Sequence, residues 1–314
     1  MTTPKTQTGA LARQQAIYSA GMSGSRPTVP TDYAALEAAA EKAMSEEGYA
    51  YIAGGAGRES TMSANRRAFE RWRIVPRMLR NVEDRDTSIE LFGRRLDTPF
   101  VLCPIGVLEM AHDEADIAVA RAAAARGTPM LFSNQASRSM EECAAAMQRV
   151  RNDAPRWFQL YWSKSDALVE SLVSRAEACG CEAIVVTLDT TLLGWRSRDL
   201  DLAHLPFLLG QGIAQYTSDP VFRASLSEVP DDGPRPKINT RTLRNVMAAA
   251  RHYPGSSLRA LTSGQALAAV RQFIATYSRP NITWTDLAWL RQRTKLPIVL
   301  KGVLDGDDAR LAVE

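Results

Sequence analysis

The feature of this sequence that most limits its fold is a pattern that repeats from about residue 98 onward. Each repeat has a short apolar run followed by an Ala- or Leu-rich stretch of helical periodicity, and successive runs start roughly 30 residues apart, the length of one βα unit. Four runs show this spacing, at residues 100–103, 130–133, 157–161 and 183–187. Runs that are apolar throughout are typical of parallel strands covered by helices on both faces.

The stretches between these runs predict the helices that such a sheet needs, over residues 115–125, 140–150 and 167–178. Further along, residues 284–294 predict a helix, 297–300 predict a fifth strand, and a last helix starts at Gly306. Five parallel strands in regular succession fit an α/β fold of the (β/α)8 TIM-barrel type better than an open sheet. We therefore expect an incomplete barrel of about five of eight βα units, because the sequence is a fragment or the gene product is truncated.

The segment before the repeat predicts an arm followed by a helical extension. Residues 1–30 are polar and lack periodicity, which predicts a mobile arm, so the barrel domain is expected over residues 31–314. A helix is expected to begin at Asp32, with Gly48 placed as its stop.

Two further irregular stretches complete the expected organisation. Residues 70–74 and 88–92 read as short strands, with a turn at Gly93. Residues 192–280, rich in Gly, Pro, Asp and Ser, follow the fourth strand and predict a long loop or insertion. A loop of that length inside a compact domain is typical of a functional lid, for which the best candidate is 205–222.

Composition excludes several classes of function. The net charge is only +3, with 38 basic and 35 acidic residues well mixed, so no nucleic-acid or membrane-surface partner is expected. The start is polar, and no apolar run approaches the roughly 20 residues that span a bilayer. The four cysteines include Cys179 and Cys181, which are too closely spaced for a zinc pair and predict buried thiols rather than metal ligands. We expect a soluble, cytoplasmic protein without a metal site.

Candidate functional residues lie at or just after the carboxyl ends of the predicted strands, at the edge where barrel enzymes carry their active sites. Lys301 is the most informative of them, because an amine that ends an apolar strand is suited to contact a ligand. The alternative for each residue is that it only terminates a strand, or, for Lys301, that it extends from an exposed sheet edge. The set is Pro104, Ile105, Gly106, Ser133, Asn134, Gln135, Gln159, Tyr161, Thr187, Asp189 and Lys301.

From about residue 31 to its end, the chain resembles the FMN-dependent 2-hydroxy-acid oxidases and dehydrogenases. The motifs that carry this resemblance are YIAGGA at 51–56, PRMLR at 76–80, WFQLY at 157–161, TLD at 187–189 and LPIVLKG at 296–302. Within that family, the segments 156–162, 194–200, 205–207 and 218–222 resemble the lactate 2-monooxygenase branch most. Two positions depart from the family pattern: Gln135 stands where many members have tryptophan, and Gly106 where many have alanine.

The resemblance implies a cofactor and residues that hold it. Lys301 would lie beside the pyrimidine edge of FMN, which gains negative charge on reduction, so a fixed cation there stabilises the reduced state. Gly106 would let the backbone approach the ring closely. The residues that would hold the ring edge by hydrogen bonds are Pro104, Ile105, Gly106, Ser133, Gln159 and Thr187.

The resemblance also assigns roles toward the substrate. Arg196 would bind the substrate carboxylate as a bidentate cation, and Tyr51 would donate a hydroxyl to it. Tyr161 would hydrogen-bond the 2-oxygen of the substrate. Asp189 would orient the catalytic histidine of the family. For each residue a purely structural role is the alternative: a salt bridge for Arg196, packing for Tyr51 and Tyr161, and a helix cap for Asp189.

The family places that histidine in a His-Gly-Gly-Arg segment after its sixth strand, and this sequence contains no such segment. His112, His204 and His252 do not match the motif. We therefore expect this 314-residue chain to show no turnover by itself.

The resemblance implies FMN-dependent oxidation of an L-2-hydroxy acid with O2, above all lactate, giving acetate, CO2 and water as a lactate 2-monooxygenase does. A simple oxidase that releases the keto acid and H2O2 is the near alternative. A truncated, non-catalytic remnant and a different flavin- or phosphate-binding barrel are the others. Relatives are often tetramers, so a homo-oligomer is expected. The sequence leaves the preferred hydroxy acid open.

Overall fold

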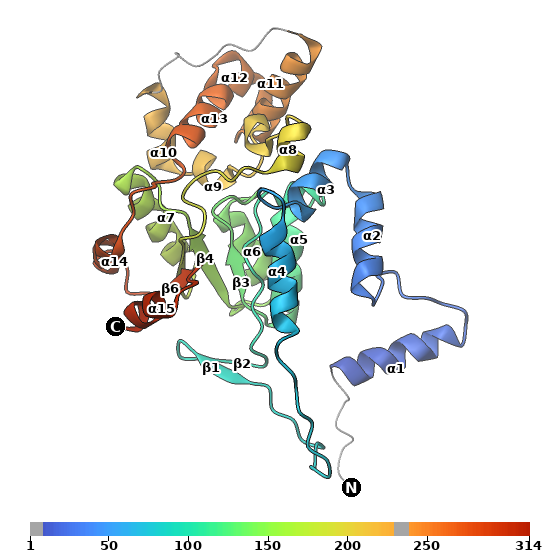
Figure 1. The fold of residues 1–314 in the computed structure, drawn as a ribbon. Helices are drawn as coiled ribbons and strands as arrows, with labels where there is room; N and C mark the ends of the chain where they lie inside the picture. Colours follow the sequence, from blue (N-terminus) through green and yellow to red (C-terminus); the bar gives the residue numbers. More distant parts are fainter. Residues whose placement is uncertain (1–8, 229–238) are drawn as a thin grey trace. The chain divides into compact units, whose positions relative to one another are not determined.

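The computed structural model describes residues 9–228 and 239–314 (Figure 1). These described residues divide into two compact units, with the boundary between Ala53 and Gly54. The described residues of the smaller unit form three helices: α1 (Ala10–Gly21), α2 (Tyr33–Ala43) and α3 (Glu46–Ala53). No residue of α1 is buried. The sequence predicts no helix in the arm over residues 1–30, so α1 is an element that was not predicted.

Local capping sets the bounds of α2 and α3. The Asp32 carboxylate accepts a hydrogen bond from Ala35 N at 2.9 Å, which confirms the predicted start of α2. The predicted stop at Gly48 is wrong, because α2 ends at Ala43 and Gly48 lies inside α3. There the Ser45 hydroxyl accepts from Gly48 N at 3.1 Å and starts a second helix.

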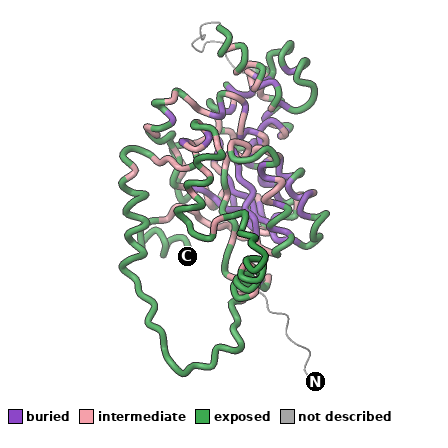
Figure 2. Tube along the Cα trace, turned by 90° about the vertical axis from the view of Figure 1, so that its right-hand side faces the viewer, coloured by how far each residue is buried: buried purple, intermediate pink, exposed green. Residues whose placement is uncertain are grey.

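The larger unit is built on a parallel sheet whose strands follow one another in sequence order. The strands are β3 (Met130–Phe132), β4 (Arg156–Leu160), β5 (Ile184–Thr187) and β6 (Ile298–Lys301). Every residue of β3, β4 and β5 is buried, as expected for strands covered on both faces, and Figure 2 shows the buried core along them. Sequence-ordered parallel strands with helical connections are the arrangement of a (β/α)8 barrel, so the predicted fold class is confirmed.

The first predicted strand forms only in part. Leu102 joins the sheet by a single bridge to Met130, while the neighbouring Phe100 is 72% exposed. The helices of the repeat lie where they were predicted. They are α5 (Ala115–Arg126), α6 (Met140–Val150), α7 (Asp166–Ala178), α14 (Trp284–Arg291) and α15 (Gly306–Val313).

The predicted short strands have different outcomes. β1 (Ile89–Leu91) and β2 (Arg94–Leu96) form a hairpin, with Gly93 in the turn at φ 75°. The strand expected at 70–74 is wrong. Trp72 and Ile74 are 81% and 95% exposed, and no strand in the described ranges pairs with this stretch, so the apolar residues have nothing to pack against.

The insertion at 192–280 lies after the strand at 184–187 as predicted, but it is not a loop, because its described residues are mostly helical. They form α8 (Ser197–Asp201), η2 (Pro206–Leu209), α9 (Ala214–Thr217), α10 (Pro220–Ala224), η3 (Ser225–Glu228), α11 (Thr240–His252), α12 (Ser257–Thr262) and α13 (Gln265–Thr276). Three of the residues that suggested a loop, Pro206, Gly210 and Pro220, lie at helix ends instead, while residues 229–238 of the predicted loop lie outside the described residues. Pro206 and Pro220 begin helices, and Gly210 ends η2 in the left-handed conformation at φ 75°.

The stretch 205–222 is packed rather than loose. Tyr216 and Phe222 are buried, and the Tyr216 ring lies 4.8 Å from Phe273 of α13 and 5.5 Å from Phe222, between ring centroids. A lid in this stretch would have to break these contacts to open. None of the helices in the described residues is both long and apolar enough to cross a membrane.

Candidate active site

The first group of predicted site residues forms a buried hydrogen-bonded row across three neighbouring strands. The Ser133 hydroxyl donates to Gln159 Oε1 at 3.1 Å, and Gln159 Nε2 donates to the Thr187 hydroxyl at 3.0 Å. All three residues are buried. The parallel register aligns the carboxyl ends of β3, β4 and β5, which is why residues so far apart in sequence meet here.

Lys301 and Asp189 form the second group, at the same edge of the sheet. Thr187 of β5 lies opposite Lys301 of β6, and the Lys301 amine contacts Asp189 Oδ2 at 3.1 Å. Both side chains remain about two-fifths exposed, at 39% and 40%, so the pair is open to a ligand. At that exposure, solvent screens the attraction between the two charges.

Gly302 explains how Asp189 reaches the lysine. Its φ is 100°, a conformation that L side chains rarely adopt, and a Cβ there would lie 2.7 Å from the Asp189 Cβ and 2.8 Å from its carboxyl carbon. A side chain at residue 302 would therefore displace the carboxylate.

The predicted loop at Pro104, Ile105 and Gly106 lies against the loop after β3. Val107 N donates to Gln135 O at 2.9 Å, and a Cβ on Gly106 would lie 3.3 Å from the Gln135 Cβ. The two positions that depart from the family pattern are thus in contact, which sequence alone did not indicate. Ile105 is 45% exposed.

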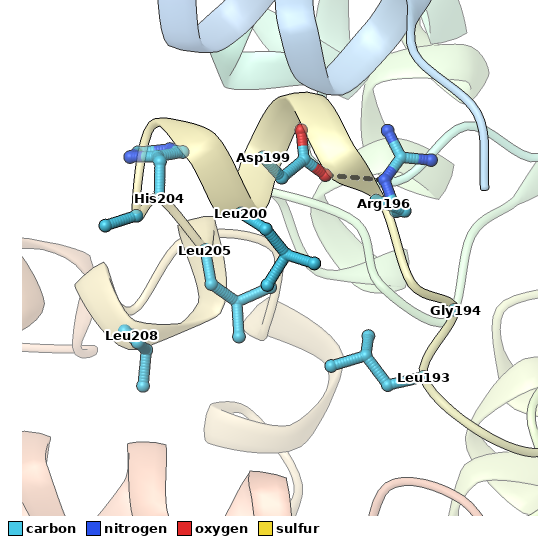
Figure 3. A pocket seen from close by; sticks show the side chains of 9 residues that line it. Leu193, Gly194, Arg196, Asp199, Leu200, His204, Leu205 and Leu208 are labelled. Atoms are coloured by element: carbon cyan, nitrogen blue, oxygen red, sulfur yellow. Dashed lines mark hydrogen bonds and ion pairs between the residues drawn. The ribbon is translucent and has the colours of Figure 1, made fainter. Parts of the chain in front are cut away.

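Arg196 lies in a separate pocket beside α8. Its Nε contacts Asp199 Oδ2 at 2.5 Å, and Asp199 is buried. The pocket has a volume of about 160 Å³. Figure 3 shows leucine side chains gathered near the Arg196–Asp199 pair. In this view His204 and Arg196 lie on opposite sides of Asp199. The lining includes Leu193, Leu200, Leu205 and Leu208 as well as Arg196, Asp199 and His204.

The backbone around Arg196 is held by the glycine-rich motif of the sequence. Gly57 N donates to Trp195 O at 2.7 Å, and Arg198 pairs with Glu59 at 2.6 Å. The Arg198 guanidinium and the Gly55 N–H hold the pKa of Glu59 below its usual range. Residues 54–59 therefore help to fix the start of α8.

The remaining predicted residues lie in other places. Tyr51 is in α3 of the smaller unit, so its role toward the substrate stays a prediction. Tyr161 directly follows β4, and its backbone N donates to Asn134 Oδ1 at 2.7 Å. Of the histidines, His252 pairs with Glu109 at 3.1 Å, and His112 Nδ1 accepts from Glu114 N at 3.1 Å.

Asn134, one of the predicted strand-end residues, is buried, although the sequence assigned it no individual role. Three further buried polar residues, Gln215, Tyr216 and Asp219, had no predicted role. They come from the insertion, for which the sequence offered no register against the sheet.

Asp116 is a further buried carboxylate near this edge. Its Oδ2 accepts from Ser137 N at 2.8 Å and Arg138 N at 3.0 Å, so it ties α5 to the loop after β3. Burial raises the pKa of Asp116 to about 6, although the two backbone N–H groups act in the opposite direction. This carboxyl group titrates in a range where most aspartates are fully ionised.

Residues 40–314 match the family described as FMN-dependent dehydrogenase, and the chain therefore belongs to that family. It is 37% identical over 302 residues to an FMN-dependent alpha-hydroxy acid dehydrogenase of Penicillium citrinum, covering 96% of this chain and 67% of the relative. It is 35% identical over 284 residues to an L-lactate oxidase of Lysinibacillus sphaericus, covering 90% and 64%. The chain thus spans about two thirds of the length of these relatives.

The solved structures that resemble it include mandelate oxidase with (S)-4-hydroxymandelic acid. The TM-score is 0.66 at 32% identity, over 89% of this chain and 66% of the other. The predicted family is confirmed, and FMN is the cofactor of that family. The comparisons do not single out the lactate monooxygenase branch, since they include lactate and mandelate oxidases alike.

The described residues suit a flavin ring. A flat ring with a hydrogen-bonding edge that gains negative charge needs polar groups in a row and one reachable cation. The Ser133–Gln159–Thr187 row supplies the first and Lys301 the second, on adjacent strands of one edge. Gly106 packs closely against the loop after β3, because a Cβ there would lie 3.3 Å from the Gln135 Cβ.

Proposed function

We propose that this chain supplies the ring-binding and substrate-binding part of an enzyme that oxidises a small L-2-hydroxy acid with FMN and O2. The observation that carries the proposal is the placement of Lys301 beside the Ser133–Gln159–Thr187 row at the carboxyl edge of the sheet. Bound FMN would supply a two-electron acceptor. Membership of the FMN-dependent family supports the choice of this cofactor.

Each residue of the site then has a physical task. The Lys301 cation would stabilise the charge that develops at the ring edge on reduction. The Ser133–Gln159–Thr187 row would orient that edge by hydrogen bonds. Asp189, held beside Lys301 at 3.1 Å, keeps the local charge balanced and would favour a protonated base near it.

Substrate binding is assigned to Arg196 and Tyr161. Asp199 holds the Arg196 guanidinium from its Nε side, which orients a fork suited to a carboxylate. The Tyr161 hydroxyl would donate to the 2-oxygen. Lactate is the proposed substrate because an L-lactate oxidase is among the relatives and the segments 194–200 and 205–207 resemble the lactate 2-monooxygenase branch.

The proposed outcome with O2 is acetate, CO2 and water. The tight packing of the stretch 205–222 supports this outcome. A segment that does not open easily would slow the release of the keto acid and exclude water from the site. Product analysis of an enzyme in which this chain is joined to the histidine segment of the family separates the alternatives: acetate and CO2 support the monooxygenase reaction. Pyruvate and H2O2 in equal amounts would establish a simple oxidase instead.

The ring site is tested by titrating the chain with FMN and with lumiflavin, which has the ring without the phosphate, and following flavin fluorescence. Both should bind, and Lys301→Met should shift the midpoint potential of the bound flavin to more negative values, by about 30 mV for each tenfold loss of preference for the reduced form. Lys295→Met is the matched control, since Lys295 is exposed at the other end of β6 and should leave the potential unchanged. Failure of both flavins to bind would refute the proposal.

A further inference from the structure

The helical insertion reaches the sheet edge through α9, which forms hydrogen bonds to the loop after β3. Ala214 N donates to Ala136 O at 3.2 Å, and Gln215 Nε2 donates to Ser133 O at 3.2 Å. Gln215 Oε1 accepts from Met140 N at 3.0 Å. Gln215 is fully buried, so these bonds are shielded from water. The loop that carries Ser133 is therefore held from outside the barrel strands.

The next residue of α9, Tyr216, brings a hydroxyl to the same place. Its ring is fully buried, between Phe222 and Phe273. Gln215, the residue before Tyr216, is bonded to Ser133, the residue before Asn134, so the two chain segments lie side by side at this point. Burial raises the pKa of Tyr216, and the Asn134 side chain lowers it in part.

Asn134 in turn contacts two residues of the proposed site. Its Oδ1 accepts from Tyr161 N at 2.7 Å, and its backbone N donates to Gln159 Oε1 at 3.3 Å. Asn134 Nδ2 and Tyr216 Oη are both buried, and neither has a hydrogen-bond partner among the residues that the structure describes. Buried polar atoms without partners are rare, and two that lie together indicate a shared bond.

We propose that Tyr216 is a positioning residue for Tyr161 and acts through Asn134. The Tyr216 hydroxyl accepts from Asn134 Nδ2, directly or through one buried water. An asparagine amide has a donor end and an acceptor end, so engaging the donor keeps the oxygen facing Tyr161 N. The inference rests on the proposed function, in which Tyr161 binds the 2-oxygen of the substrate. It makes the insertion part of the site and not only its cover.

Hydrogen exchange of the Tyr161 backbone amide in the flavin-free chain tests this inference, because that amide donates to Asn134. Tyr216→Phe should lower the protection of Tyr161 roughly three- to tenfold, while the Leu160 amide inside β4 keeps its protection. Tyr253→Phe is the matched control, since Tyr253 is also a buried tyrosine of the insertion and should leave Tyr161 unchanged. Asn134→Ala should remove the protection whether or not Tyr216 is present.

Two results would overturn the positioning role. One is unchanged Tyr161 protection in Tyr216→Phe, and the other is an equal loss at Leu160 and Tyr161, which means that the hydroxyl only supports the fold. A second measurement needs no variant: the wild-type NMR spectrum should show a cross-peak between the Asn134 side-chain amide and the Tyr216 ring, and its absence would also refute the contact. None of these readouts requires FMN, so they are independent of the flavin titration.

Discussion

The strongest prediction concerns Arg175, which fastens the insertion to the barrel. Asp219 is fully buried, and its Oδ2 accepts from Arg175 Nη1 at 3.0 Å and from the Ser171 hydroxyl at 2.8 Å. Its Oδ1 caps α10 by accepting from Val221 N and Phe222 N, at 2.9 and 3.1 Å. The side chain of Arg175 is only 14% exposed, so the pair is largely withdrawn from water.

Arg175→Met keeps most of the side-chain volume and removes the charge. Asp219 would then be a buried carboxylate without its cation, a change that typically costs about 3–5 kcal/mol. The bonds from Ser171, Val221 and Phe222 remain, so we expect the lower end, a loss of about 3 kcal/mol in the free energy of unfolding.

Urea denaturation at pH 7, followed by circular dichroism, measures this loss. Arg121→Met is the control, because Arg121 and Glu114 form an exposed pair, 47% and 50% accessible, and should change stability by under about 1 kcal/mol. Adding Asp219→Asn to Arg175→Met should recover part of the loss, since no unpaired charge is then buried. A loss below about 1 kcal/mol for Arg175→Met would refute the claim that the 205–222 stretch is anchored by this pair.

Three further predictions concern the site itself. Gly302→Ala should weaken flavin binding and stability together, because the new Cβ would overlap Asp189; wild-type values for both would contradict the geometry. Asp116 has its pKa raised to about 6, so its stabilising contribution is present below pH 3.8 and is lost as the pH rises through 6. The unfolding free energy of wild type minus that of Asp116→Asn should therefore fall by about 2–3 kcal/mol from pH 4 to pH 7, and a flat difference would refute the raised pKa. Lys301→Met should lower the flavin potential while Lys295→Met does not, as measured by dye equilibration.

Much of the barrel could be predicted because its signals are local and repeated. Apolar runs roughly 30 residues apart, each followed by a helical pattern, leave few other folds. The polar residues at the carboxyl ends of these runs also meet as expected, because parallel strands bring those ends to one edge of the sheet. They are Ser133, Gln159, Thr187 and Lys301. The strand expected at 70–74 failed because an apolar run becomes a strand only if a neighbour pairs with it.

The helices of the insertion, residues 192–280, could not be predicted from the sequence. Its Gly and Pro residues indicated a loop, yet Pro206 and Pro220 start helices and Gly210 ends one. A loop and a series of short helices can have the same content of Gly and Pro. The two differ only in where these residues lie relative to the helix ends.

From the order of its residues alone, this chain determines the βα repeat, the family and the edge at which its polar side chains gather, since each follows from local periodicity and contiguous motifs. Only the tertiary structure decided which distant residues touch: Asp219 with Arg175, Gln215 with Ser133, and Gly302 with Asp189. The physical reason is that burial and packing between elements set these contacts. No spacing along the chain encodes them.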